Sequence, residues 1–277
     1  MFVFDHILAA RPTLLFSVKH LLLGGAQISG YSTLMTAEVD PNSALNKGKP
    51  YAQLTVDLYR EYQWSEGAGT FVQVAFPGLY PDLTRYQAEQ DQRSVNAGQD
   101  TWKYDAAQVA RNLAVKLLTW SDKAQTAVLS GSGSRDVNAA VQVRSNGPDH
   151  PTIKVTLSRL EGNTANIWEA IAVADSSVMS ITSPQRWDIL TSPVTVKGTG
   201  SAFEGDVGTL YVLDHLYTAI GHAKGVPANN GNTTFVATVP YTASFHSTQE
   251  GVLACYTYSQ ADGGIAGVVM LKVLIAA

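Results

Sequence analysis

The sequence predicts an α+β part, in which an antiparallel sheet carries one main helix, followed by an all-β sandwich. Two observations predict this division. Residues 106–120 show strong helical periodicity and stand among strand-like segments. The C-terminal third contains short apolar runs separated by frequent turn signals, which is the pattern of a β-sandwich. We therefore expect a leader or poorly defined segment over 1–31, the α+β part over 32–177 and the sandwich over 180–277.

Composition limits the classes of function. The chain has 277 residues, 15% of them charged, and a formal net charge of −4, so it is long enough for two cores. Lysine and arginine form no cluster, which excludes an electrostatic footprint for nucleic acid. The low charge and the many small and β-branched residues favour a secreted or cell-surface β protein. Cys255 is the only cysteine, and we expect it to be a small buried hydrophobe.

The first 27 residues contain apolar patches that charged residues interrupt. No run reaches the ~20 residues that a transmembrane helix needs, so we predict no membrane-spanning segment. Lys19 and His20 also divide the apolar core that a signal peptide requires. Three interpretations remain open, namely a degraded or mis-started export signal, a mobile leader and a first structured segment. The first of these is favoured.

The α+β part opens with a predicted hairpin made of residues 51–63 and 71–76, in which polar and apolar residues alternate. Asp82 is expected to cap a surface helix that ends near Asn96, before Gly98. The spacing of Asp105 and Gln108 resembles a capping box at the start of the main helix. Four more strands are expected over residues 127–129, 137–143, 153–160 and 167–173. The boundary to the sandwich is placed near residues 175–177.

The sandwich is expected to begin in the stretch 181–214. Pro184 and Pro193 stand where edge strands would begin, because proline costs no ladder hydrogen bond there. A glycine-bearing turn at 204–206 follows. The expected strands cover residues 194–196, 207–213, 217–221, 234–239, 251–259 and 265–275.

Several segments of this part carry a resemblance to a known family. They are ITSP at 181–184, SPV at 192–194, VKGTG at 196–200, FEG at 203–205, FVA at 235–237, EGVL at 250–253 and DG at 262–263. Residues 180–277 thereby resemble the immunoglobulin-like domain of spore-germination-type proteins, Gmad2. The resemblance implies an immunoglobulin-like sandwich in an envelope or extracellular accessory protein, and it assigns no catalytic residue.

The first part is similar to segments that precede this domain in some bacterial surface proteins. The similarity rests on FPGLYP at 76–81, GQDTW at 98–102 and IWE at 167–169. Many family members carry an export signal or a lipid-attachment cysteine, and neither is clear in this chain. The resemblance implies an extracytoplasmic location, at the cell surface or secreted.

Two groups of residues are candidate sites. Asp214, His215 and His222 flank a predicted hairpin whose ends would meet, so they are candidate ligands of a divalent metal. Their spacing follows no established metal motif, and a solvated turn is the ordinary alternative. Trp102, Trp120 and Trp168 are candidate pocket-lining residues in the first part. Aromatic residues at such positions are more often core.

Two functional hypotheses follow, and neither includes a cofactor. In the first, the chain is a non-enzymatic extracytoplasmic binding or structural module whose partner is an envelope protein or a cell-wall component. In the second, the first part holds a small-molecule or carbohydrate site that either binds or hydrolyses its ligand, and the sandwich is an accessory. A pocket beside Trp102 and Trp120 with convergent carboxylates would favour the second hypothesis, and a solid apolar core at that place would remove it.

Overall fold

The computed structural model describes the chain except for residues 7, 9–10, 176–178, 201–206 and 228–233. The predicted turn at 204–206 and most of the predicted boundary at 175–177 therefore lie outside the described residues. The structure is mainly β, with two α-helices in its described part. Neither helix is long and apolar enough to cross a membrane.

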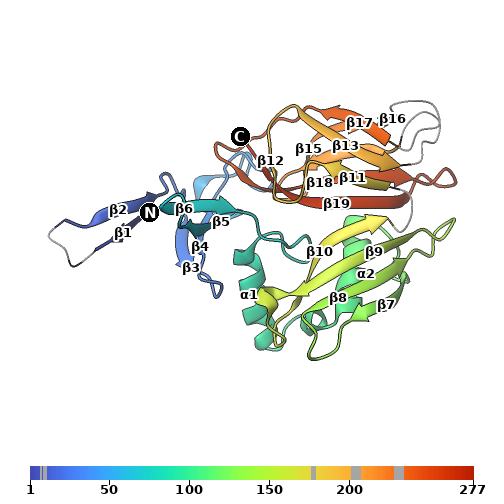
Figure 1. The fold of residues 1–277 in the computed structure, drawn as a ribbon, viewed down its shortest axis with the longest axis horizontal. Helices are drawn as coiled ribbons and strands as arrows, with labels where there is room; N and C mark the ends of the chain where they lie inside the picture. The colour runs from blue at the N-terminus through green and yellow to red at the C-terminus, as the bar shows by residue number, and fades with distance from the viewer. Residues whose placement is uncertain (7, 9–10, 176–178, 201–206, 228–233) are drawn as a thin grey trace.

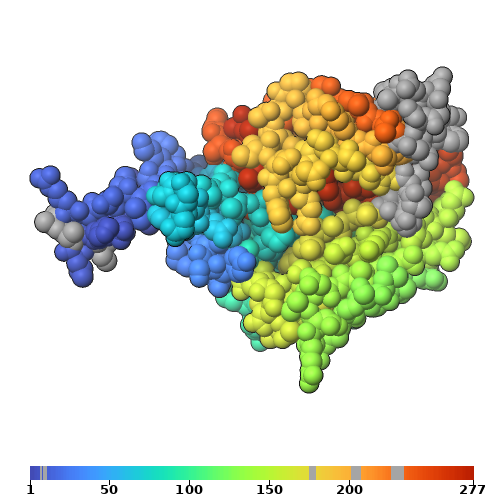
Figure 2. Space-filling view, in the orientation of Figure 1, coloured from blue at the N-terminus to red at the C-terminus, as the bar shows by residue number. Residues whose placement is uncertain are grey.

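The first 74 residues form a hairpin and a four-stranded antiparallel sheet. The hairpin of β1 (Phe2–Asp5) and β2 (Thr13–Ser17) extends away from the rest of the molecule (Figures 1 and 2). The sheet has the order β3 (Gly25–Ile28), β4 (Leu34–Glu38), β5 (Leu58–Ser65) and β6 (Thr70–Val74). Three strands thus lie within residues 1–31, whose role as a leader stays a prediction.

The predicted hairpin of residues 51–63 and 71–76 is confirmed as β5 and β6, which pair antiparallel. Its first strand begins later than expected. A short 3-10 helix, η1 (Tyr51–Gln53), and residues 54–57, which lie outside any strand, occupy the start of that range. A helical turn is favoured over a strand there because Pro50 has no N–H to donate to a strand ladder, and proline is tolerated at the start of a helix.

The two helices lie close to their predicted positions. Helix α1 (Arg85–Asn96) is capped by Thr84, whose side chain accepts a hydrogen bond from the Gln87 N–H, and not by Asp82. Helix α2 (Ala106–Leu117) ends three residues earlier than expected. Its predicted cap is confirmed, since Oδ1 of Asp105 accepts hydrogen bonds from two backbone N–H groups at 2.8 and 3.2 Å.

This cap gives a direct stability prediction. We expect Asp105→Ala to lower the free energy of unfolding by about 1 kcal/mol, because two helix N–H groups lose their acceptor. Asp105→Ser keeps a capping oxygen and should lose less. Urea unfolding of the three proteins measures the difference, and equal stability of Asp105→Ala and the wild type would contradict the assignment.

One nine-stranded sheet runs through both halves of the chain. From one edge its order is β7 (Gln125–Gly131), β8 (Asn138–Arg144), β9 (Thr152–Arg159), β10 (Trp168–Asp175), β19 (Ile265–Ile275), β18 (Gln249–Tyr258), β14 (Thr209–Leu213) and β15 (Ala219–Lys224), with β12 (Ile189–Leu190) parallel to β19. The halves join where Val173 of β10 pairs with Met270 of β19. Figure 1 shows β10 beside the long β19.

The C-terminal half adds a second sheet and becomes a sandwich. This sheet has the order β11 (Met179–Ser183), β13 (Val194–Gly200), β17 (Thr234–Val239) and β16 (Val226–Pro227). Pro184 follows the edge strand β11, whereas Pro193 precedes β13, which has a neighbour on both sides. Proline is tolerated there because it stands just outside the strand and not within its ladder.

Strand β18 of the sandwich buries both of its faces over most of its length. On β18, Leu253 and Cys255 point into the sandwich core, which confirms the prediction for Cys255. The alternate residues Val252 and Ala254 join a second, larger core together with Val109 and Leu113 of α2. Because successive side chains of a strand point to opposite faces, the sandwich sheet separates two cores and shares one of them with the N-terminal half.

Candidate functional site

A cavity of about 580 Å³ lies where the four-stranded sheet, the end of β9 and the sandwich meet. β5 and β6 contribute one wall, and Arg85 at the start of α1 contributes another. The sandwich adds Trp187 and Leu274. Its lining residues are Tyr31, Thr33, Glu61, Gln63, Gln73, Val74, Ala75, Phe76, Pro77, Arg85, Ser158, Arg159, Leu160, Glu161, Gly162, Glu169, Ile171, Trp187 and Leu274.

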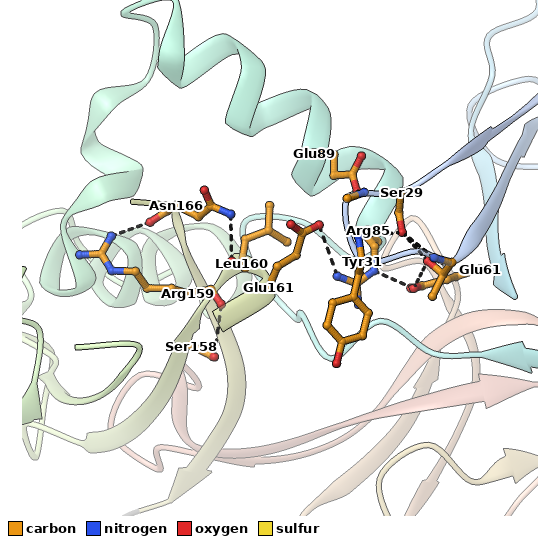
Figure 3. A network of polar contacts seen from close by, with 12 residues as sticks. Ser29, Tyr31, Glu61, Arg85, Glu89, Ser158, Arg159, Leu160, Glu161 and Asn166 are labelled. Atoms are coloured by element: carbon orange, nitrogen blue, oxygen red, sulfur yellow. Dashed lines mark hydrogen bonds and ion pairs between the residues drawn. The ribbon is translucent and has the colours of Figure 1, made fainter. Parts of the chain in front are cut away.

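Arg85 is a cation in the wall of this cavity, and Figure 3 shows it between Glu161 and Glu61. It is buried, and its Nε donates a hydrogen bond of 2.6 Å to Oε1 of Glu61. Its Nη1 lies 3.8 Å from Oε1 of Glu161. The guanidinium carbon lies 4.6 Å from the ring centre of Tyr31 and 5.1 Å from that of Phe76. Two carboxylates and two aromatic faces thus hold this cation in place.

Glu161 and Glu89 form a pair of carboxyl groups behind Arg85. Burial raises the pKa of Glu161, the neighbouring Glu89 raises it further, and Arg85 opposes both effects. Glu89 also accepts a 2.7 Å hydrogen bond from the Gly30 N–H. A side-chain carbon at Gly30 would stand only 3.0 Å from Oε2 of Glu161, so a larger residue there would press against this carboxyl group.

Glu169 lines the cavity as a buried acid. Burial raises its pKa well above the usual value, and the nearby Asp82 raises it further. The pKa of Asp82 is itself raised to about 8, first by burial and then by Asp91. In both groups desolvation favours the protonated form.

The second cation of the lining, Arg159, is also engaged. Its Nη1 donates to the Asn166 carbonyl at 2.5 Å, and its Nε donates to the Asp136 carbonyl at 3.2 Å. Its guanidinium lies 4.3 Å above the ring of Trp168. Both arginines of the lining are therefore already engaged by polar partners.

The three predicted pocket tryptophans belong to the α2 core and not to this cavity. Trp168 is fully buried, and Trp120 is 7% exposed with its Nε1 donating to the Ile265 carbonyl at 2.8 Å. Trp102 is half-buried against the same core. Trp120 borders a smaller cavity of about 150 Å³. All three tryptophans thus pack in or against one apolar core, and Trp120 also lines the smaller cavity.

The three predicted metal ligands do not converge. Oδ1 of Asp214 accepts hydrogen bonds from the backbone N–H groups of Leu216 and Thr218 at 2.8 and 2.9 Å. His215 is buried, with its Nε2 3.9 Å from Oδ2 of Asp57. His222 is exposed on β15, stacked on Tyr211. Within the described ranges, no group of three or more His, Cys, Asp and Glu side chains is arranged to hold a metal ion.

Sequence reasoning missed the residues that surround the large cavity. Glu61 lies on the predicted strand 51–63, where period-two alternation suggests one polar, solvated face. Both faces of β5 are buried instead, because α1 packs near one of them. A signal that could have found the site is the presence of Arg60 and Glu61 side by side in a strand, since buried charges need partners. No sequence pattern around Trp187 indicated that it would line a cavity.

Comparison with known proteins identifies the C-terminal part only. Residues 178–264 match the family model described as the immunoglobulin-like domain of bacterial spore germination, Gmad2. No curated protein and no solved structure matches the chain. The matched range contains Trp187 and ends just before β19, the strand that joins the two halves of the large sheet. The C-terminal part of this chain therefore carries a Gmad2 immunoglobulin-like domain.

Proposed function

We propose that this chain is a non-catalytic, extracytoplasmic binding protein, and that the cavity between its N-terminal half and its Gmad2 domain is the ligand site. One observation carries the proposal. A cavity of about 580 Å³ draws its walls from both halves, and its size falls in the range of about 300–1,000 Å³ that is typical of small-molecule sites. The α+β layout of residues 32–177 is part of this proposal.

The state of the charged groups supports binding over catalysis. Arg85 is fixed between Glu61 and Glu161, and two aromatic ring centres lie within 5.1 Å of its guanidinium carbon. A group held in this way can orient a ligand at little entropic cost, because its own rotamer is already fixed. The envelope setting rests on the Gmad2 domain, and it makes a cell-wall component the partner class that we favour.

A hydrolytic site is the second candidate, and one observation favours it. Glu169 borders the cavity with a raised pKa, which is the state that a general acid needs. Turnover of a glycoside that is lost in Glu169→Gln, with folding unchanged, would replace the binding proposal by this one.

A ligand screen with an occluding variant tests the binding proposal. Gln63 is exposed and lines the cavity, so Gln63→Trp should fill part of the cavity without removing a buried contact. Lys154→Trp is the matched control, since Lys154 is exposed on β9 and is absent from the lining. We expect cell-wall glycans or small metabolites to raise the melting temperature of the wild type and of Lys154→Trp, and not that of Gln63→Trp. A shift that survives in Gln63→Trp would contradict the proposal.

A further inference from the structure

Trp187 has the features of a binding platform at the mouth of the cavity. It lines the cavity and is 52% exposed, and it is the only tryptophan among the exposed large hydrophobic residues of the described part of the chain. A large aromatic ring that is exposed beside a cavity is available to contact a ligand.

The backbone holds this side chain in place at a conformational cost. Trp187 has a φ of 70°, in the left-handed region that bulky residues rarely adopt. Its N–H donates a 2.8 Å hydrogen bond to the carbonyl of Lys272 on β19. The guanidinium of Arg186 lies 5.1 Å from its ring centre. Unfavourable backbone conformations persist where surrounding contacts fix them, and they cluster at ligand sites.

The remaining lining points to an uncharged polar ligand. Arg85 is paired with Glu61, and Arg159 is bound to two carbonyls and a ring. An anionic ligand would have to compete with Glu61 for Arg85, and a cationic ligand would have to compete with Arg85 for the carboxylates. Hydroxyl groups can donate to carboxylates and accept from amides at the same time, and Gln63 and Gln73 add amide groups to the wall.

We propose that the cavity binds a short uncharged oligosaccharide, with one sugar ring stacked on Trp187 and its hydroxyl groups directed to Arg85, Glu161 and the two glutamines. Sugar rings present an apolar face of C–H groups and a rim of hydroxyl groups. The site offers the complement of both, because an aromatic platform lies beside paired charged groups. This inference rests on the proposed function and specifies its ligand class.

The test uses the full chain and four probes. Chitotriose and maltotriose are uncharged trisaccharides, while putrescine and citrate are a small cation and a small anion. Titration calorimetry measures the dissociation constants, and tryptophan fluorescence reports on the exposed indole. Trp187→Ala removes the platform, and Trp187→Phe keeps an aromatic face. Ile189→Ala is the matched control, because Ile189 is 60% exposed two residues away and does not line the cavity.

We expect at least one trisaccharide to bind the wild type and to change its fluorescence. Trp187→Ala should weaken that binding about tenfold, as loss of one aromatic stacking contact implies. Trp187→Phe and Ile189→Ala should stay within about threefold of the wild type, and Trp187→Phe should lose the fluorescence change.

The contradicting outcomes separate this inference from the proposed function. If putrescine or citrate binds in a way that Gln63→Trp abolishes while neither trisaccharide binds, the oligosaccharide inference fails and the cavity remains a ligand site. If a trisaccharide binds Trp187→Ala as tightly as the wild type, the claim that a sugar ring stacks on Trp187 is wrong. If none of the probes and no compound of the wider screen binds, both the inference and the proposed function fail.

Discussion

Lys272→Met is expected to destabilise the protein by about 3–5 kcal/mol, the cost of leaving a buried charge without its partner. Lys272 is fully buried on β19, and its Nζ lies 2.7 Å from Oε2 of Glu250 on β18. It also donates hydrogen bonds to the carbonyls of Gly78 and Leu83. Glu250 in turn accepts a 3.0 Å hydrogen bond from the Phe76 N–H. This pair therefore fixes the segment before α1 onto the sandwich.

The loss should depend on pH in a defined direction. Burial raises the pKa of Glu250 from 4.5 to about 7, and Lys272 opposes that rise. Removing Lys272 should raise the folded-state pKa further. A carboxyl group with a raised folded-state pKa contributes its full stability below its unfolded pKa, and that stability is lost as the pH rises through the folded pKa. We therefore expect the destabilisation to be greater at pH 8 than at pH 5.

Urea unfolding at the two pH values measures this effect. Lys154→Met is the control, because Lys154 is exposed on β9, and it should stay within about 0.5 kcal/mol of the wild type. The double variant Lys272→Met/Glu250→Gln removes the unpaired charge and should recover part of the loss at pH 8. A Lys272→Met protein that unfolds like the wild type at pH 8 would show that the pair is not buried in this way.

The second large effect is expected for the isolated fragment 180–277. The sequence predicts that this fragment folds alone. The structure shows which buried side chains the fragment would expose to solvent. Val252, Val268 and Met270 face the core that the sandwich shares with α2, and all three are at most 1% exposed. Exposing three such side chains removes at least about 4 kcal/mol of hydrophobic stabilisation.

We therefore expect the fragment to unfold at clearly lower urea concentration than the full chain and to self-associate through its uncovered face. Equilibrium unfolding and sedimentation velocity measure the two properties. The variant fragment with Val268→Thr and Met270→Gln is the control, and it should self-associate less. A monomeric fragment with the stability of the full chain would contradict a shared core.

Local sequence signals predicted much of the secondary structure. The α2 periodicity, the Asp105 cap and the hairpin of β5 and β6 each depend on residues near one another in sequence. The recurrent motifs of the Gmad2 domain identified the sandwich for the same reason. In each case the structure follows from residues close together in sequence, because helix caps and the alternation of polar and apolar residues involve only a few neighbouring positions.

Such local signals did not predict how the two halves of the chain join. The pairing of Val173 with Met270 joins residues almost a hundred positions apart, and no local pattern records it. The cavity depends on the same long-range packing, which places Trp187 and Arg85 in the lining of one cavity. Lys272 carried a partial signal, because a lysine inside an eleven-residue apolar strand must find a carboxylate if both faces are covered.

Calorimetry of the full chain tests the central claim, that the Gmad2 domain and the N-terminal half form one structural unit around the cavity. A sheet and a core shared across the junction predict a single unfolding transition whose calorimetric and van't Hoff enthalpies agree. Two separate transitions, one of them matching the isolated fragment 180–277, would contradict the claim.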